Sequence, residues 1–299
     1  MPDFGIFRGF NDKLFGDKLY AGQLPTQLGL IGSENAVTFF YLLNDYPNAA
    51  AAYSLRLLRS AYTGDAIEVR IDTTGQPTYD IGFINNELDV TTLQGYCTGG
   101  LDAYVTTWYD QSGNGNDATQ TTAANQPQIV SSGSVILENG KAAVQFDGTN
   151  DNLPNGVGTA LPSDVSAFVV RSFSSYPSTY RTMFNYKTWG LTHNSAGGGS
   201  YGIAHIFSQS TTSKSNDYPT TTGQGLDFLY NKSNLERNNY ISTLSAGGGY
   251  GPGISALGSW SGTAQCFSGK IQELVIYEID QNSNKSGIKT NINDFYSIY

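Results

Sequence analysis

The fold is decided between residues 49 and 128, which read AAAAYSLRLLRSAYTGDAIEVRIDTTGQPTYDIGFINNELDVTTLQGYCTGGLDAYVTTWYDQSGNGNDATQTTAANQPQ. The clearest element is residues 67–71, where three aliphatic residues alternate with charged ones. Alternation of period two is typical of a strand with one buried face, so we predict a strand there. Apolar residues at helical spacing before it predict a short helix over residues 51–59.

A second strand is predicted at residues 104–109, which are rich in β-branched and aromatic side chains. It follows a short helix ending near Cys97 and runs into Asp110–Asp117, a segment without one apolar side chain. Asp and Asn can bond to their own backbone and glycine allows positive φ, so this segment is interpreted as a built turn. Its oxygens, and those of a turn at residues 147–152, are Ca²⁺-type ligands. Neither loop has EF-hand spacing, and a structural role is favoured.

Several motifs in this stretch resemble the catalytic domain of the fungal α-L-arabinofuranosidase B family. They are Ala51–Arg56, Ser60–Gly64, Val69-Arg70, Asp80-Ile81, Tyr96-Cys97, and Trp108–Gly113 with Asn116. Beyond residue 130, Phe146–Asp151 and Phe267–Tyr277 resemble laminin-G and concanavalin A-like sandwiches at large. The ending Asn291–Tyr296 resembles such domains in bacteriophage virion proteins. The resemblance implies a jelly-roll β-sandwich, and a choice between an enzyme and a virion component.

The remaining strands are predicted from alternation and turn signals at sandwich-like spacing. They are residues 141–147, 165–173, 181–186, 201–207, 225–230, 240–244, 254–260 and 269–279. Ile288, Ile292 and Phe295 predict a closing helix, while residues 36–43 fit either a buried strand or a helix. We therefore predict an all-β, concanavalin A-like jelly roll over residues 36–299, with short helices.

The composition of the chain favours some classes of protein and argues against others. Charged residues make up only 14% of the chain, and Gly, Tyr and hydroxyl residues are abundant, which is typical of an extracellular or particle-surface β-protein. A net charge of −9 argues against nucleic acid, whose phosphates need Lys and Arg. No run approaches the roughly 20 apolar residues of a membrane helix. The two cysteines, Cys97 and Cys266, are more typical of buried thiols than of a bridge, and the two histidines make no zinc site.

Residues 1–35 are predicted to be an anchoring arm, because glycines interrupt every helical register of an apolar segment. An arm lying on its own domain is the alternative. The anchoring residues would be Phe4, Phe7, Phe10 and Phe15, docking on other virion proteins or on each other in a homotrimer. The N-terminus lacks the apolar core of a signal peptide, as expected of a virion protein made in the host cytoplasm or of a processed secreted enzyme, and the initiating Met1 favours the virion protein.

A retaining glycosidase needs two carboxylates roughly 5–5.5 Å apart. In the family resembled, the pair is implied to lie in the second half of the domain near a vicinal cysteine pair, which this sequence lacks. Between residues 165 and 271 the only acidic residues are Asp217, Asp227 and Glu236, each interpreted as a solvated turn carboxylate. No catalytic residue and no cofactor are therefore predicted.

Sugar binding is predicted at aromatics beside glycine-rich turns, because lectin-like sandwiches stack aromatic rings on sugars. The candidates are Trp189, Tyr201, Tyr250 and Trp260. The sequence thus favours a non-enzymatic virion protein, a head or tail fibre or decoration subunit, displaying a lectin-like domain for host-surface glycans. The alternative is a glycoside hydrolase acting on α-L-arabinofuranosides.

Overall fold

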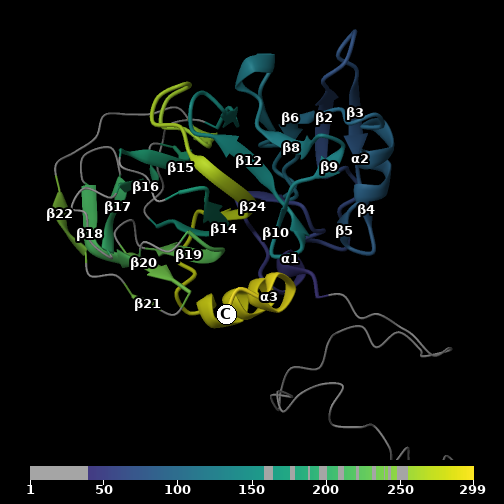
Figure 1. Cartoon of the computed structure of the whole chain (residues 1–299). Helices are drawn as coiled ribbons and strands as arrows, with labels where there is room; N and C mark the ends of the chain where they lie inside the picture. Colours follow the sequence, from purple (N-terminus) through teal and green to yellow (C-terminus); the bar gives the residue numbers. More distant parts are fainter. Residues whose placement is uncertain are drawn as a thin grey trace, which may run out of the picture. The chain divides into compact units, whose positions relative to one another are not determined.

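The structure is a computed structural model (Figure 1). It describes residues 40–157, 164–175, 179–187, 189–194, 201–207, 212–219, 222–230, 234–238, 240–241, 244–247 and 255–299, and gives the backbone alone at 194, 201–207, 212–219 and 244–247. The chain divides into Met1–Phe39 and Phe40–Tyr299, and only the second unit is described below. The predicted arm, with Phe4, Phe7, Phe10 and Phe15, lies outside the described residues.

Two antiparallel sheets make up the described unit. The main path of the larger sheet runs β21 (Tyr240–Ile241), β20 (Asn234–Arg237), β19 (Gly225–Tyr230), β14 (Ser166–Phe173), β24 (Ser268–Tyr277), β12 (Val144–Asp147), β8 (Gln128–Ser131), β6 (Ala103–Trp108), β2 (Ile67–Ile71) and β3 (Thr78–Ile81). Off this path, β1 (Ala51–Ser54) pairs with β24, β7 (Ala118–Thr119) with β6, and β9 (Ser134–Val135) with β8.

The smaller sheet runs β13 (Leu153–Pro154), β23 (Ala256–Leu257), β15 (Arg181–Tyr186), β16 (Trp189–Asn194), β17 (Tyr201–Phe207), β18 (Thr212–Pro219) and β22 (Leu244–Gly247). Two hairpins complete the strands, β4 (Phe83–Ile84) with β5 (Glu87–Leu88), and β10 (Leu137–Glu138) with β11 (Lys141–Ala142). The described helices are α1 (Leu42–Asp45), α2 (Val90–Tyr96), α3 (Lys285–Tyr296) and the 3₁₀ turn η2 (Ala123–Asn125). None of them is long and apolar enough to cross a membrane.

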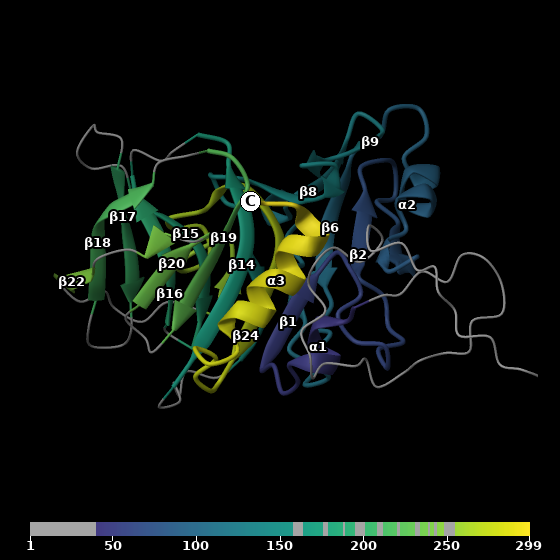
Figure 2. The ribbon, with the colours of Figure 1, turned by 90° about the horizontal axis from the view of Figure 1, so that it is seen from below.

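The main core lies between the sheets, where apolar side chains of both meet. Strand β14 shows how: Ala167 and Val169 enter this core, while Phe168 and Val170 point to the opposite face. That face is covered by α1 and α3, and Figure 2 shows α3 lying across β14, β24 and β1. Such layering is a sandwich, which confirms the predicted all-β, concanavalin A-like fold.

The predicted closing helix is α3, although Tyr296 rather than Phe295 is its fully buried aromatic. The predicted helix at 51–59 is wrong, because residues 51–54 form β1 and residues 55–59 are not helical. Ala51 pairs with Ile276 and Tyr53 with Leu274 on β24, and all four residues of β1 are buried. The central strand β24 supplies hydrogen-bond partners that local spacing does not reveal, and tertiary pairing overrides helical propensity here.

A buried ion pair ties β1, β24 and α3 together. Arg56 Nε and Nη2 donate to the two carboxylate oxygens of Glu273 at 2.8 and 3.0 Å, and neither side chain is exposed by more than 2%. Ser54 Oγ donates to the same carboxylate at 2.8 Å, and the Tyr296 hydroxyl at 3.3 Å. This fork geometry satisfies the buried charges, which would otherwise destabilise the core.

Candidate functional site

The polar segment after β6 is organised by Asp110. Its Oδ1 accepts the backbone N–H of Ala52 and Ser112, and its Oδ2 accepts the Ser112 hydroxyl and the Asn116 N–H. Asn114 also connects this segment to the chain just before β1, because its Nδ2 donates to the carbonyl of Ala49 at 2.9 Å. The segment therefore fastens β6 to β1, and the predicted built turn is present.

Gln111, the residue after Asp110, is fully buried and bonds the end of β1 and the residues just past it. Its amide nitrogen donates to the carbonyls of Ser54 and Arg56, and its Oε1 accepts the Leu58 N–H. The Trp108–Gly113 motif thus reflects the architecture of the fold rather than a ligand site. Among the described residues, no group of three His, Cys, Asp or Glu side chains could hold a metal ion.

Two of the three acidic residues considered from the sequence belong to buried ion pairs. Asp227 lies inside β19, fully buried, and accepts Arg171 Nε at 2.8 Å and Nη2 at 3.1 Å. Glu236 lies in β20, 3% exposed, between Lys285 at 2.5 Å and Lys289 at 3.3 Å. Their interpretation as solvated turn carboxylates is wrong, because each is held in a strand by a cation far along the chain.

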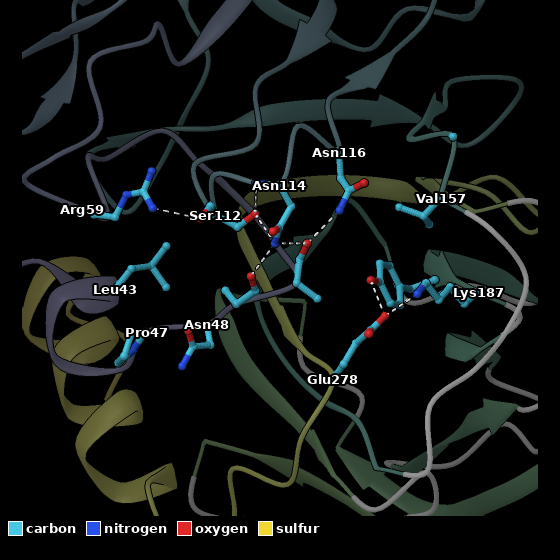
Figure 3. A pocket seen from close by; sticks show the side chains of 14 residues that line it. Leu43, Pro47, Asn48, Arg59, Ser112, Asn114, Asn116, Val157, Lys187 and Glu278 are labelled. Atoms are coloured by element: carbon cyan, nitrogen blue, oxygen red, sulfur yellow. Dashed lines mark hydrogen bonds and ion pairs between the residues drawn. The ribbon is translucent and has the colours of Figure 1, made fainter.

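The larger pocket lies where strands of both sheets end, and we call it the end pocket (Figure 3). Its volume is about 670 Å³, and it is lined by Leu43, Pro47, Asn48, Ala49, Ala50, Arg59, Ser112, Asn114, Asn116, Gly156, Val157, Tyr186, Lys187 and Glu278. Glu278 is the one carboxylate in this lining. It accepts the Tyr186 hydroxyl at 2.9 Å and the Lys187 ammonium at 2.5 Å.

A second pocket, which we call the sheet pocket, lies over the face of the large sheet turned away from the main core. Its volume is about 470 Å³, and it is lined by Arg70, Asp72, Gln76, Tyr104, Ala123, Ala124, Gln126, Gln128, Gln145, Asp147 and Asp151. Its floor is one row of side chains across β2, β6, β8 and β12, because Arg70 pairs with Tyr104, Tyr104 with Gln128, and Gln128 with Gln145.

The row is held in place from one end. Arg70 Nε donates to Gln126 Oε1 at 2.7 Å, and Arg70 Nη1 pairs with Asp72 at 3.1 Å. The guanidinium also lies over the Tyr104 ring, 4.8 Å from its centroid. The Gln145 amide lines this pocket and makes no hydrogen bond with the described residues.

Asp151 closes the other end of the sheet pocket. It follows the turn after β12, where Asp147 Oδ1 accepts the N–H of Thr149 and Asn150, and Asp147 N–H donates to Asp151 Oδ2 at 2.8 Å. The residue is only 6% exposed. Burial, reinforced by the charge and a hydrogen bond of the Asp147 carboxyl, raises the pKa of Asp151 to about 7.

The aromatic candidates fall in different places. Trp189 is fully buried and packs edge-on against Phe184, 5.7 Å between ring centroids, which corrects its assignment as a sugar-binding residue. Trp260 is half-buried beside β23, and its carbonyl accepts Asn185 Nδ2 at 3.2 Å. Tyr201 begins β17, and its side chain lies outside the described part, as does Tyr250 altogether. Sugar binding at these three stays a prediction.

Neither the end pocket nor the sheet pocket was predicted from the sequence as a binding site. The turn at 147–152 was recognised, but the burial of Asp151 depends on elements distant in sequence. Asn150 Nδ2 bonds the carbonyl of Ala124 at 2.7 Å, and Arg181 Nη1 donates to the carbonyl of Gly148. The signal available locally was polar residues at the outward positions of β2, β6, β8 and β12. Cys97 and Cys266 are free and buried.

No protein-family model matches the sequence, and no curated protein matches it significantly. Among solved structures the chain is similar to a GH54 α-L-arabinofuranosidase soaked with a cyclic sulfate inhibitor, at a TM-score of 0.56. A glutamate-to-glutamine mutant of a GH54 α-L-arabinofuranosidase, soaked with 4-nitrophenyl α-L-arabinofuranoside, also gives 0.56. An arabinofuranosidase complexed with arabinofuranosyl-α-1,2-xylobiose gives 0.54. Each is 17% identical to this chain, and each comparison covers 82% of this chain and 62% of the other.

These findings correct the prediction of a non-enzymatic protein, because all three solved structures are of glycoside-cleaving enzymes. At 17% identity the likeness itself shows the fold, and the chain spans less than two thirds of the length of those structures. The activity of this chain is therefore a matter for proposal. The virion setting, the homotrimer and host-glycan binding stay predictions.

Proposed function

We propose that this chain is a glycoside hydrolase acting on α-L-arabinofuranosides, and that Asp151 in the sheet pocket is its proton donor. The fold supports the general activity, because the sandwich is shared with arabinofuranosidases over most of this chain. The observation that carries the assignment is the buried Asp151 carboxyl at the edge of a polar pocket.

The acidic residues of the chain support the choice of pocket. Hydrolysis of a glycoside uses two carboxyl groups, one protonated and one ionised. Between residues 158 and 254, the one acidic side chain outside the described part is that of Asp217. The end pocket has Glu278 as the one carboxylate of its lining, whereas the sheet pocket has three carboxyls, those of Asp72, Asp147 and Asp151.

A general acid must hold its proton at the working pH, and a pKa of about 7 gives Asp151 that property near neutrality. The Asp147 N–H donates to the Asp151 carboxyl at 2.8 Å, and the Asp147 carboxyl helps to raise the pKa of Asp151. We therefore assign Asp147 to tuning Asp151. Asp72, which pairs with Arg70 at 3.1 Å, is the third carboxyl of this pocket.

The chemistry follows from these roles. Asp151 donates its proton to the glycosidic oxygen as the bond to the anomeric carbon breaks, so the leaving sugar departs as an alcohol. Water then adds to the anomeric carbon and gives a proton to the Asp151 carboxylate, which restores the acid and completes hydrolysis. The amides of Gln128 and Gln145 offer hydrogen bonds to the hydroxyls of the substrate.

The test compares two substrates of the wild-type protein and of Asp151→Asn. An alkyl α-L-arabinofuranoside needs its leaving oxygen protonated, and the variant should lose roughly 10²–10⁴-fold in kcat. 4-Nitrophenyl α-L-arabinofuranoside has a leaving group that departs as a stable anion, so the loss should be far smaller. Asp45→Asn, an exposed change of the same type in α1, is the matched control. Equal losses on both substrates would remove the acid role from Asp151.

A further inference from the structure

The end pocket differs in charge from the rest of the chain. Three charged side chains line it, Arg59, Lys187 and Glu278, so two positive charges meet one negative charge and the lining carries +1. The whole chain carries −9. A positive pocket in an acidic protein attracts anions selectively, because its local potential opposes that of the surrounding surface.

The net positive charge of the lining comes from Arg59, because the other two charged side chains neutralise each other. Lys187 neutralises Glu278 at 2.5 Å, on the side of the pocket opposite Arg59 (Figure 3). Arg59 donates from Nη1 to the carbonyl of Ser112 at 3.0 Å, and among the described residues no carboxylate lies within 4.0 Å of its guanidinium. The nearby Asp110 accepts four hydrogen bonds, one from the Ala52 N–H of β1 and three from Ser112 and Asn116 of its own loop. A planar guanidinium without a carboxylate partner is suited to a bidentate contact with a ligand carboxylate.

Two asparagines of the lining, Asn114 and Asn116, indicate which hydrogen-bonding groups the ligand carries. Asn114 and Asn116 commit their Nδ2 groups to the carbonyls of Ala49 and Ala50. Their side-chain oxygens have no partner in the described part of the chain, and an amide oxygen can only accept a hydrogen bond. A ligand that fits them carries hydroxyl donors, which a fully ionised phosphate or a simple inorganic anion lacks.

The walls add an apolar surface and a suitable size. Leu43, Pro47 and Val157 supply aliphatic contacts, against which the C–H face of a sugar ring can pack. The volume of about 670 Å³ falls within the range of ligand pockets and exceeds that of the sheet pocket. We propose that the end pocket is a binding site for an acidic sugar of the hexuronic acid class, with the carboxylate on Arg59 and the hydroxyls on Asn114 and Asn116.

The test is calorimetric titration with methyl β-D-glucuronide and with methyl β-D-glucoside, which has the same ring without the carboxylate. Charge-assisted bonds to Arg59 should make the glucuronide bind about tenfold or more tightly. Arg59→Gln should abolish that preference. Lys141→Gln, which removes one positive charge outside the pocket, should keep it. Equal affinities, no binding of either sugar, or a preference that survives Arg59→Gln would overturn the proposal.

A second measurement covers the case in which Arg59→Gln does not fold. In the wild-type protein, titration with the glucuronide should shift the backbone amide resonances of Asn114 and Asn116, and inorganic phosphate at the same ionic strength should not. Shifts of these amides with phosphate alone would show a site for small anions and contradict the sugar assignment. Because binding is measured without turnover, the outcome is independent of the proposed hydrolysis at Asp151.

Discussion

Replacing Asp151 by asparagine is expected to change how the free energy of unfolding depends on pH. In the folded protein the pKa of Asp151 is raised from 3.8 to about 7, whereas the unfolded chain has the lower value. A group with a raised pKa in the folded state gives stability that is fully present below the unfolded pKa. That stability is lost as the pH rises through the folded pKa.

The magnitude follows from the width of that window. Between pH 5 and pH 8 about two pH units lie below the folded pKa, and each is worth about 1.4 kcal/mol. The wild-type protein should therefore lose about 2–3 kcal/mol relative to Asp151→Asn over this range. Asparagine does not titrate, and its Oδ1 can still accept the Asp147 N–H, so the pH-independent part of the substitution cancels in the difference.

Urea unfolding of both proteins at pH 5, 6, 7 and 8 measures this difference, with Asp45→Asn as a control that should follow the wild type. The stability of the wild type relative to Asp151→Asn should fall steadily from pH 5 to about pH 7 and then level off. Parallel curves for the wild type and Asp151→Asn would show that Asp151 titrates as in the unfolded chain. The burial argument for its role as an acid would then fail.

Other predictions concern the framework of the fold. Glu273→Gln should destabilise the protein by about 3–5 kcal/mol in urea unfolding, because Arg56 is left buried without its partner; a loss below about 1 kcal/mol would contradict this. Removing residues 1–35 should leave the circular dichroism of the sandwich unchanged while abolishing the predicted homo-oligomer in sedimentation, and an unfolded product would make the arm part of the domain. Burial raises the pKa of Cys266 to about 11, so its thiol should react with a disulfide reagent only after denaturation; rapid labelling of the folded protein at pH 8 would refute this.

Local patterning predicted the elements whose partners are neighbours in sequence. Residues 67–71 alternate cleanly, and the structure places their aliphatic side chains in the main core as β2. The helix prediction for residues 51–54 was wrong because their hydrogen-bond partners lie on β24, more than 200 residues along the chain. A strand that is buried on both faces has no alternation to recognise, and a short apolar run then fits a helix equally well.

The site was harder to predict because its chemistry arises from packing. Asp151 sits in a sequence typical of a turn, and its raised pKa comes from burial and the neighbouring Asp147. Asp227 was also interpreted as a solvated turn residue. In the structure it lies in a strand and pairs with Arg171, which is 56 positions away on the adjacent strand. Both features depend on which strands become neighbours, which composition and spacing do not encode. The Trp108–Gly113 motif, in contrast, predicted the fold. Its Asp110 and Gln111 side chains bond the backbone of β1 and of the residues just after it, so the motif is part of the fold itself.

Turnover of an alkyl α-L-arabinofuranoside tests the central claim most directly. The wild-type protein should release the alcohol with a rate that falls as the pH rises through about 7, where Asp151 loses its proton. Asp151→Asn should reduce that rate by about 10²–10⁴-fold while remaining folded. No turnover by the wild-type protein, or full activity in folded Asp151→Asn, would contradict the assignment of Asp151 as the proton donor of a glycoside hydrolase.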